Sequence, residues 1–173
     1  MKMPHSPRRA FAPLRLNSTL GKVIFPILYA LFLNFLSAQA QQEDIKDEIL
    51  KEINARRAEG CTCGEEKMNA AGPLLWNEKL EKAAVRHVKD IYDHEHFSHI
   101  GTDGSKLKDR VDDTGYKWST IGENISFGYT TVPDVVKGWL NSEGHCRNIM
   151  NPAFTEMGAA NLDSYWVLDL GSR

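Results

Sequence analysis

The chain has 173 residues with 21 basic and 23 acidic side chains, so its formal net charge at neutral pH is −2. This length suits one domain with a sizeable core and leaves little room for two. Residues 1–40 hold five of the basic residues and none of the acids, so residues 41–173 carry 16 basic against 23 acidic residues, or −7. An acidic domain without a basic stripe is a poor match for nucleic acid, which we exclude as a partner.

Residues 1–40 have the layout of a secretory signal peptide. A basic lead precedes an apolar run, Val23–Leu36, and the small residues Ala38 and Ala40 follow it. We expect cleavage after Ala40, which would release residues 41–173 as a single domain outside the cell or in a periplasm, without a stable membrane span. The alternative is an uncleaved anchor, which the short apolar run disfavours.

The first element predicted after the leader is a helix that ends at Gly60, with acids at its start and arginines near its end, as the helix dipole favours. Its apolar residues recur at helical spacing: Ile45, Ile49, Leu50 and Ile53. After a loop, Asn77 is placed to cap a second helix over residues 78–94. His87 lies on the apolar face of that helix, and we expect it to be a buried core histidine.

Two further helices and a small sheet complete the predicted pattern. Residues 106–115 predict a short helix, and residues 130–142 predict another with a threonine cap and a proline in its first turn. Three segments predict strands, of which the first two form a hairpin: 156–162, 165–171 and 122–128. Four helices around a small, mostly antiparallel sheet predict an α+β domain with α/β/α layers.

Six motifs follow one another along residues 45–171: INARRAEG, LLWNEKLEKAAVRHVKDI, FSHIGTDGS, GENISFG, WLNSEGHCRNIMNPAFTEMG and YWVLDLG. Their order and spacing resemble bacterial members of the CAP superfamily, which unites cysteine-rich secretory proteins, antigen 5 and pathogenesis-related 1 proteins and is also called SCP. The resemblance implies a three-layer α/β/α sandwich with a central cleft. Asn54 and Arg57 resemble an N-x-x-R pair of the family, and we expect them to hydrogen-bond to loops.

The resemblance also implies a site in the cleft, where the family places two histidines and one or two glutamates. The matching residues are His99 of FSH, Glu123 of GEN and His145 of GHC. Many eukaryotic members have a second glutamate where this chain has Ser142, and Glu143 stands one residue further on. Imidazole and carboxylate groups suit a divalent metal such as zinc, the one cofactor we consider. A cleft in which these groups only hydrogen-bond to one another is the alternative.

Three cysteines, Cys61, Cys63 and Cys146, would meet an oxidising compartment in which disulfides persist. His145 is adjacent to Cys146, and sequence neighbours do not face each other on a helix or strand, so it is poorly placed to activate that thiol. The resemblance to bacterial members with GHC implies a Cys63–Cys146 bridge, with Cys61–Cys146 as second choice. Such a bridge would contribute about 4 kcal/mol of stability and tether the segment that carries His145.

The sequence is compatible with three functions. The sequence has no nucleophile elbow, HExxH motif, phosphate loop or cofactor fingerprint, so we expect a secreted, monomeric, non-enzymatic protein. The resemblance implies a small lipid or sterol-like ligand, or an extracellular protein, as its partner. One alternative is a hydrolase or protease in which His99, Glu123 and His145 hold a metal that activates water, with Glu143 or Glu123 as base. The other is an envelope interaction module that binds through its loops.

Overall fold

The computed structural model describes residues 29, 32–33 and 45–173, so the predicted leader and its cleavage site lie almost wholly outside the described residues. The chain divides into two units, Met1–Gln41 and Gln42–Arg173, and the sheets and labelled helices belong to the second. Within the described part of the chain, every helix is too short or too polar to span a bilayer.

A four-stranded mixed sheet with the strand order β3-β5-β6-β4 forms the centre of the second unit. β6 (Tyr165–Ser172) pairs antiparallel with β5 (Glu156–Leu162) and with β4 (Thr120–Phe127), as the predicted hairpin and third strand require. β3 (Leu75–Trp76) adds a parallel pairing with β5 that was not predicted, because two residues are too few to show alternation. The mostly antiparallel sheet is confirmed, and β4 is an edge strand.

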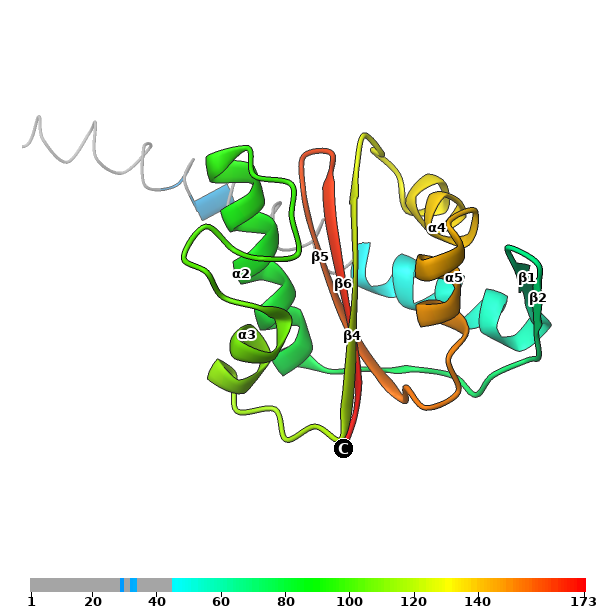
Figure 1. Ribbon diagram of the computed structural model, residues 1–173. Helices are drawn as coiled ribbons and strands as arrows, with labels where there is room; N and C mark the ends of the chain where they lie inside the picture. The colour runs from blue at the N-terminus through cyan, green and yellow to red at the C-terminus, as the bar shows by residue number, and fades with distance from the viewer. Residues whose placement is uncertain (1–28, 30–31, 34–44) are drawn as a thin grey trace, which may run out of the picture. The chain divides into compact units, whose positions relative to one another are not determined.

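Helices cover both faces of this sheet (Figure 1). α2 (Glu78–His94) and α3 (Leu107–Asp113) lie on one face. The helical residues 45–59, α4 (Val132–Leu140) and α5 (Glu143–Met150) lie on the other. The predicted α/β/α layers are confirmed. The prediction of four helices omitted α5, which the extended backbone of Ser142 separates from α4.

Alternating side chains of β5 and β6 build a core on each face of the sheet. One core joins the sheet to the helical residues 45–59, α4 and α5, and its strand residues are Met157, Ala159, Trp166, Leu168 and Leu170. The other joins the sheet to α2 through Ala84, Val88, Ile91, Ile125, Ala160 and Val167. The predicted cap of α2 is confirmed, because the Asn77 side chain accepts a hydrogen bond from the backbone N–H of Lys79.

α2 approaches the sheet very closely at Gly158 of β5. A Cβ atom at this position would lie 2.0 Å from the backbone nitrogen of Glu81, so only a residue without a side chain fits. Further along α2, His87 is completely buried, with its Nε2 atom 3.9 Å from Oε1 of Glu123 on β4. The predicted burial of His87 is confirmed.

The loop predicted after residue 60 contains a small antiparallel hairpin of β1 (Cys61–Cys63) and β2 (Glu66–Met68). Gly64 forms its turn with φ 63°, a conformation that glycine adopts without strain. In the structure, the Sγ atoms of Cys63 and Cys146 form a disulfide, with the two Cα atoms 5.5 Å apart. This bond ties the hairpin to α5, the helix that carries His145.

Arg57 connects the first helix to two loops, one that follows the β1–β2 hairpin and one that follows α5. Arg57 is 1% exposed, and its guanidinium group donates to four backbone carbonyls, those of Gly72, Ile149, Asn151 and Phe154. Asn54 exchanges two hydrogen bonds with the backbone of Leu74. The predicted loop-binding role of Asn54 and Arg57 is confirmed.

Candidate functional site

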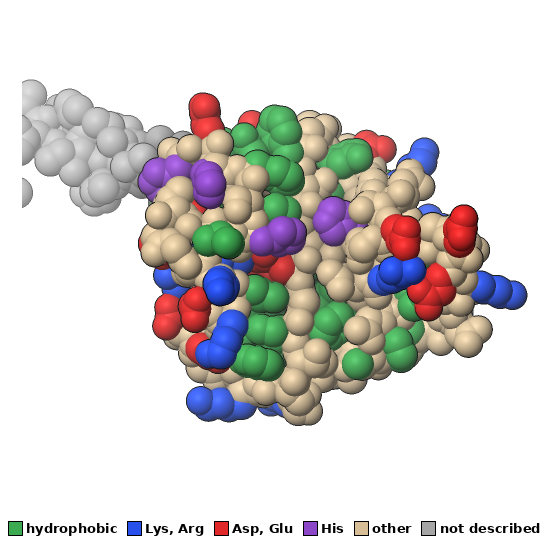
Figure 2. All heavy atoms as spheres, viewed as in Figure 1, with side chains coloured by type: hydrophobic (Ala, Val, Ile, Leu, Met, Phe, Trp, Pro, Cys, Tyr) green, Lys and Arg blue, Asp and Glu red, His purple; other side chains and the backbone are tan. Residues whose placement is uncertain are grey.

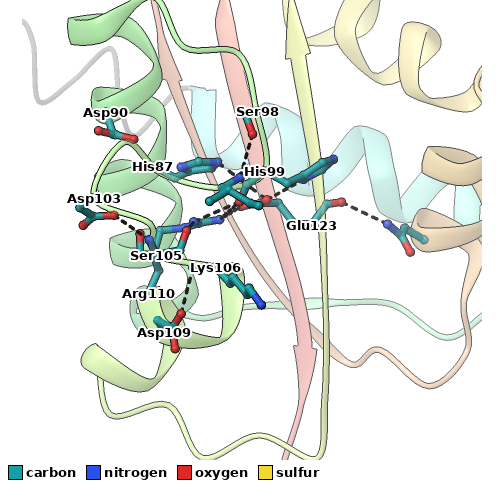
Figure 3. A network of polar contacts seen from close by, with 12 residues as sticks. His87, Asp90, Ser98, His99, Asp103, Ser105, Lys106, Asp109, Arg110 and Glu123 are labelled. Carbon is teal, nitrogen blue, oxygen red and sulfur yellow. Dashed lines mark hydrogen bonds and ion pairs between the residues drawn. The ribbon is translucent and has the colours of Figure 1, made fainter.

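Glu123 is the centre of a polar cluster on the edge strand β4 (Figure 3). Its Oε1 atom lies 2.7 Å from Nδ1 of His99, and Nη2 of Arg110 on α3 donates to its Oε2 atom at 2.6 Å. The side chains of Glu123 and Arg110 are 3% and 1% exposed, whereas that of His99 is 55% exposed. The cluster therefore connects a buried ion pair to an imidazole at the surface.

The contacts of Glu123 decide its charge. Burial alone would raise the pKa of Glu123, but the hydrogen bond with His99 and the charge of Arg110 outweigh burial and hold the pKa below its ordinary value. The carboxylate is therefore ionised at neutral pH and can only accept hydrogen bonds, so Nδ1 of His99 donates to it. This bond fixes the tautomer of a neutral His99 ring and leaves Nε2 as the nitrogen with a lone pair.

Arg110 also positions the loop that carries His99. Its Nη1 and Nη2 atoms each lie 3.3 Å from the carbonyl oxygen of His99, and Nη1 donates to the carbonyl of Ser105 at 3.0 Å. Because the same guanidinium group binds Glu123, one buried side chain aligns the loop with the strand. Arg110 could not be predicted from the sequence, since a single arginine on a short helix carries no recognisable pattern.

Asp169 of β6 is a second buried carboxyl group in this cluster. It is paired with Glu123 in the register of the two strands and is completely buried. Burial and the negative charge of Glu123 raise the pKa of Asp169 well above its ordinary value, so Asp169 holds its proton more tightly than an exposed aspartate does. His87 is neutral, because burial lowers its pKa despite the nearby Glu123. The Glu123–Arg110 pair is thus the ion pair at the centre of the cluster.

His145 reaches the site from the opposite helical layer, and Asn124 secures its backbone. Asn124 follows Glu123 on β4, points to the other face of the sheet, and donates through Nδ2 to the carbonyl oxygen of His145 at 3.0 Å. Asn148 of α5 donates to Oδ1 of Asn124 and to the carbonyl of Glu123. Burial and repulsion from the protonated form of His99 lower the pKa of His145, which places the two imidazoles within electrostatic reach.

An apolar groove with a volume of about 530 Å³ lies beside His145. Its lining residues come from the loop after α2, β4, α4 and β6, among other segments: Phe97, Ile125, Ser126, Phe127, Tyr129, Gly138, Trp139, Ser142, His145 and Tyr165. Phe97 and Phe127 are 51% and 56% exposed, and the Phe127 ring stacks on Tyr165 with centroids 4.5 Å apart. Figure 2 shows histidine and hydrophobic side chains next to one another on this face. These aromatic residues could not be predicted as one surface from the sequence, because they are distant in the chain.

The predicted metal ligands do not form a compact set. Among residues 29, 32–33 and 45–173, the only three Cys, His, Asp or Glu ligand atoms that lie within 4.8 Å of one another belong to the three cysteines. Both oxygens of Glu123 already take part in hydrogen bonds, and Glu143 forms a surface ion pair with Arg147 at 2.7 Å. The side chains as arranged do not fit a metal centre that uses His99, Glu123 and His145 together, and metal binding there stays a prediction.

Comparison with known sequences assigns most of the domain to one family. Residues 50–166 match the cysteine-rich secretory protein family, CAP. The chain is 37% identical to YkwD of Bacillus subtilis (strain 168) over 103 residues, which is 60% of this chain and 40% of YkwD. It is 35% identical to the membrane protein YlbC of the same organism over 100 residues, 58% of this chain and 29% of YlbC. The chain thus spans less than half the length of these relatives.

Comparison with solved structures agrees with this assignment. An extracellular protein with an SCP domain from Bacillus anthracis superposes with a TM-score of 0.68 at 26% identity. The match covers 76% of this chain and 41% of that protein. The family and the α+β fold inferred from the six motifs are therefore confirmed, and the chain belongs to the cysteine-rich secretory protein family, CAP.

Proposed function

We propose that this protein is a secreted CAP-domain protein whose groove binds a small apolar ligand with a neutral polar end, such as a sterol. The groove beside His145 carries this proposal. Its volume of about 530 Å³ falls in the range of small-molecule sites, which are mostly apolar with a few polar groups. Five of its lining residues are aromatic: Phe97, Phe127, Tyr129, Trp139 and Tyr165.

The exposed rings provide the driving force for binding. Phe97 and Phe127 present more than half of their surface to water although they belong to one aromatic cluster. Covering apolar surface contributes roughly 25 cal/mol for each Å² removed from water. A ligand that lies along these rings would gain this contribution without forcing the groove to open.

The polar residues of the groove favour a hydroxyl group over a carboxylate. Ser142 and His145 lie in the lining, which contains no lysine, arginine, aspartate or glutamate. Since the pKa of His145 is lowered, its ring is neutral at pH 7 and can donate one hydrogen bond and accept another. This lining offers no cation to a fatty-acid carboxylate, whereas it offers an alcohol both a hydrogen-bond donor and a hydrogen-bond acceptor.

Export is part of the same proposal. The leader pattern of residues 1–40 supports it, and the Bacillus anthracis relative is an extracellular protein. The relative YlbC is a membrane protein. Localisation experiments should therefore distinguish a released protein from one that is attached to the cell surface.

Titration with the fluorescent sterol dehydroergosterol tests the ligand class. We expect saturable one-to-one binding by the exported protein and at least about tenfold weaker binding by Phe127→Ala, a loss of about 1.4 kcal/mol. Leu75→Ala is the matched control, because Leu75 is 66% exposed but lies outside the groove. Absence of saturable binding, or an equal loss in both variants, would refute the proposal.

A hydrolase is the second candidate, with His99 and His145 as the residues that would contact a metal and Glu123 as the carboxylate that orients His99. The His99–Glu123 hydrogen bond favours it, because a carboxylate that holds Nδ1 leaves Nε2 to act as a ligand or base. Calorimetric zinc titration of the wild type beside His99→Ala/His145→Ala separates the outcomes. Tight one-to-one binding lost in the folded double variant would support this candidate. Equal weak binding in both proteins would assign zinc to the exposed His94 and His96 and reject it.

A further inference from the structure

Three sulfur atoms meet where β1 faces α5. The Sγ atom of Cys61 lies 3.4 Å from that of Cys146 and 3.7 Å from that of Cys63, and these two are bonded to each other. Cys61 is the free thiol of the three. Since two of the sulfurs share a disulfide, the trio cannot offer three thiolates to a metal. It is a thiol in contact with a disulfide.

The strand geometry of β1 accounts for this arrangement. Residues i and i+2 of a strand point to the same side, so Cys61 and Cys63 both face α5 while Thr62 points away. The register of the hairpin fixes both positions, because Cys61 is paired with Met68 and Cys63 with Glu66. Cys146 is thus within reach of either cysteine of β1.

We propose that Cys61 is an exchange thiol, and that the Cys63–Cys146 bridge is one of two interconverting isomers. In the exchange, the Cys61 thiolate attacks Sγ of Cys146 and forms a Cys61–Cys146 bond. The Cys63–Cys146 bond breaks, and its electron pair leaves on Cys63. Cys63 gains the proton that Cys61 lost, so the step needs neither an oxidant nor a reductant. α5 remains tied to β1 in both isomers.

The two isomers differ in the exposure of their free thiol. Cys61 is partly exposed, whereas Cys63 and Cys146 are completely buried. Exchange therefore moves the thiol from a position that reagents reach to one that they do not.

The same thiol would also repair an opened bridge. When a transient opening of the hairpin exposes the buried bridge, a small thiol that attacks Cys146 releases Cys63 and leaves a mixed disulfide on Cys146. Attack by Cys61 on Cys146 then expels the small thiol and restores a bridge between β1 and α5. The tether of the His145 segment would thereby resist small thiols better than an isolated disulfide.

Geometry and charge both make the exchange slow at neutral pH. For the exchange, the Sγ atom of Cys61 must approach in line with the Cys63–Cys146 bond. It would then lie nearer to the attacked sulfur than to the other by the length of an S–S bond, about 2 Å. The observed distances of 3.4 and 3.7 Å are nearly equal, so the Cys61 side chain must turn before it reacts. Burial raises the pKa of the Cys61 thiol, so the reactive thiolate accumulates only in alkaline solution. Uncatalysed disulfide rearrangement takes minutes to hours.

Thiol mapping of the exported full chain tests the proposal. The protein is held for several hours at pH 6 or pH 9, quenched in acid, unfolded and labelled with N-ethylmaleimide. Fragmentation of the labelled peptide then distinguishes Cys61 from Cys63. We expect label on Cys61 alone at pH 6, and a growing share on Cys63, together with a Cys61–Cys146 linked peptide, at pH 9. Label confined to Cys61 at both pH values would overturn the proposal.

Two variants provide an independent check. Cys63→Ser should form a Cys61–Cys146 bridge and retain no free thiol. Cys61→Ser should keep the Cys63–Cys146 bridge but lose it several-fold faster than the wild type in a small thiol such as 2-mercaptoethanol. Two free thiols or a disulfide-linked dimer in folded Cys63→Ser would contradict the exchange. If Cys63→Ser does not fold, the mapping of the wild type decides.

Discussion

Glu123 on β4 and Asp169 on β6 are directly paired across the sheet, and Glu123 contacts both α2, through His87, and α3, through Arg110. The two carboxyl groups share one buried cation, Arg110, whose hydrogen bond goes to Glu123. Two ionised carboxylates on directly paired residues would repel each other strongly in a medium of low dielectric constant. The pKa of Asp169 is therefore raised, whereas that of Glu123, the carboxylate that orients His99, is lowered.

This relationship predicts how stability depends on pH. The pKa of Asp169 is raised in the folded state. The contribution of Asp169 to the free energy of unfolding is therefore fully present below the unfolded-state pKa of about 3.9, and it is lost as the pH rises toward the folded-state pKa. Asp169→Asn removes this titration while keeping the neutral shape. We expect urea unfolding at pH 4, 6 and 8 to show that the variant gains stability relative to the wild type as pH rises. Parallel pH profiles for the two proteins would contradict the assignment of the proton.

Arg110→Ala should be strongly destabilising. It leaves the Glu123 carboxylate buried without its cation and removes the hydrogen bonds to the His99 loop, a change expected to cost about 3–5 kcal/mol. Arg86→Ala is the control, since the Arg86 side chain is 42% exposed and its ion pairs with Asp103 and Asp113 lie at the surface. Chemical denaturation should show a much larger loss for Arg110→Ala, and similar losses in both variants would refute the role given to Arg110.

Gly158→Ala should disrupt the contact between α2 and β5. The added Cβ atom would meet the backbone of α2 at 2.0 Å, so we expect a loss of about 3 kcal/mol or a failure to fold. A Cβ atom at Gly72 would meet no atom within 4 Å, and Gly72→Ala should change stability little. Thermal unfolding of both variants checks the packing of this layer, and a well-folded Gly158→Ala of normal stability would show that α2 lies elsewhere.

The two imidazoles of the site should titrate interdependently. Burial and the charge of His99 lower the pKa of His145, so His99→Ala should raise it toward, but not up to, its ordinary value. An NMR pH titration of the His145 ring measures this shift. His94→Ala serves as control, because no effect of His94 on the pKa of His145 is expected. An unchanged pKa of His145 in His99→Ala would place the two rings out of electrostatic reach.

Local patterns predicted much of the fold. Asn77 and the apolar face of residues 78–94 predicted α2 with its cap, and alternation predicted the hairpin of β5 and β6. These signals lie within one element, where periodicity and capping chemistry act over a few residues. Arg57 could be assigned to loop binding only through the family resemblance, because its four acceptors lie up to 97 residues away.

The site was harder to predict because its contacts join distant segments. GEN and FSH marked Glu123 and His99, yet nothing local indicated that Arg110 and Asp169 would complete the buried cluster. The aromatic groove shows the same limit, since Phe97, Phe127 and Tyr165 become neighbours only once the sheet forms. The strand β3 was missed for another reason, because its two residues are too few to display a period.

Photo-crosslinking with a diazirine-bearing sterol tests the central claim most directly, because it reports binding and its location together. The exported protein is irradiated with the probe, with and without excess unlabelled sterol, and the modified peptides are sequenced by mass spectrometry. We predict that the probe crosslinks to the segments that line the groove: Phe97, residues 125–129, the surroundings of His145, and Tyr165. Excess unlabelled sterol should reduce these crosslinks. Crosslinks outside these segments, or crosslinks that excess sterol does not reduce, would contradict a ligand site beside His145.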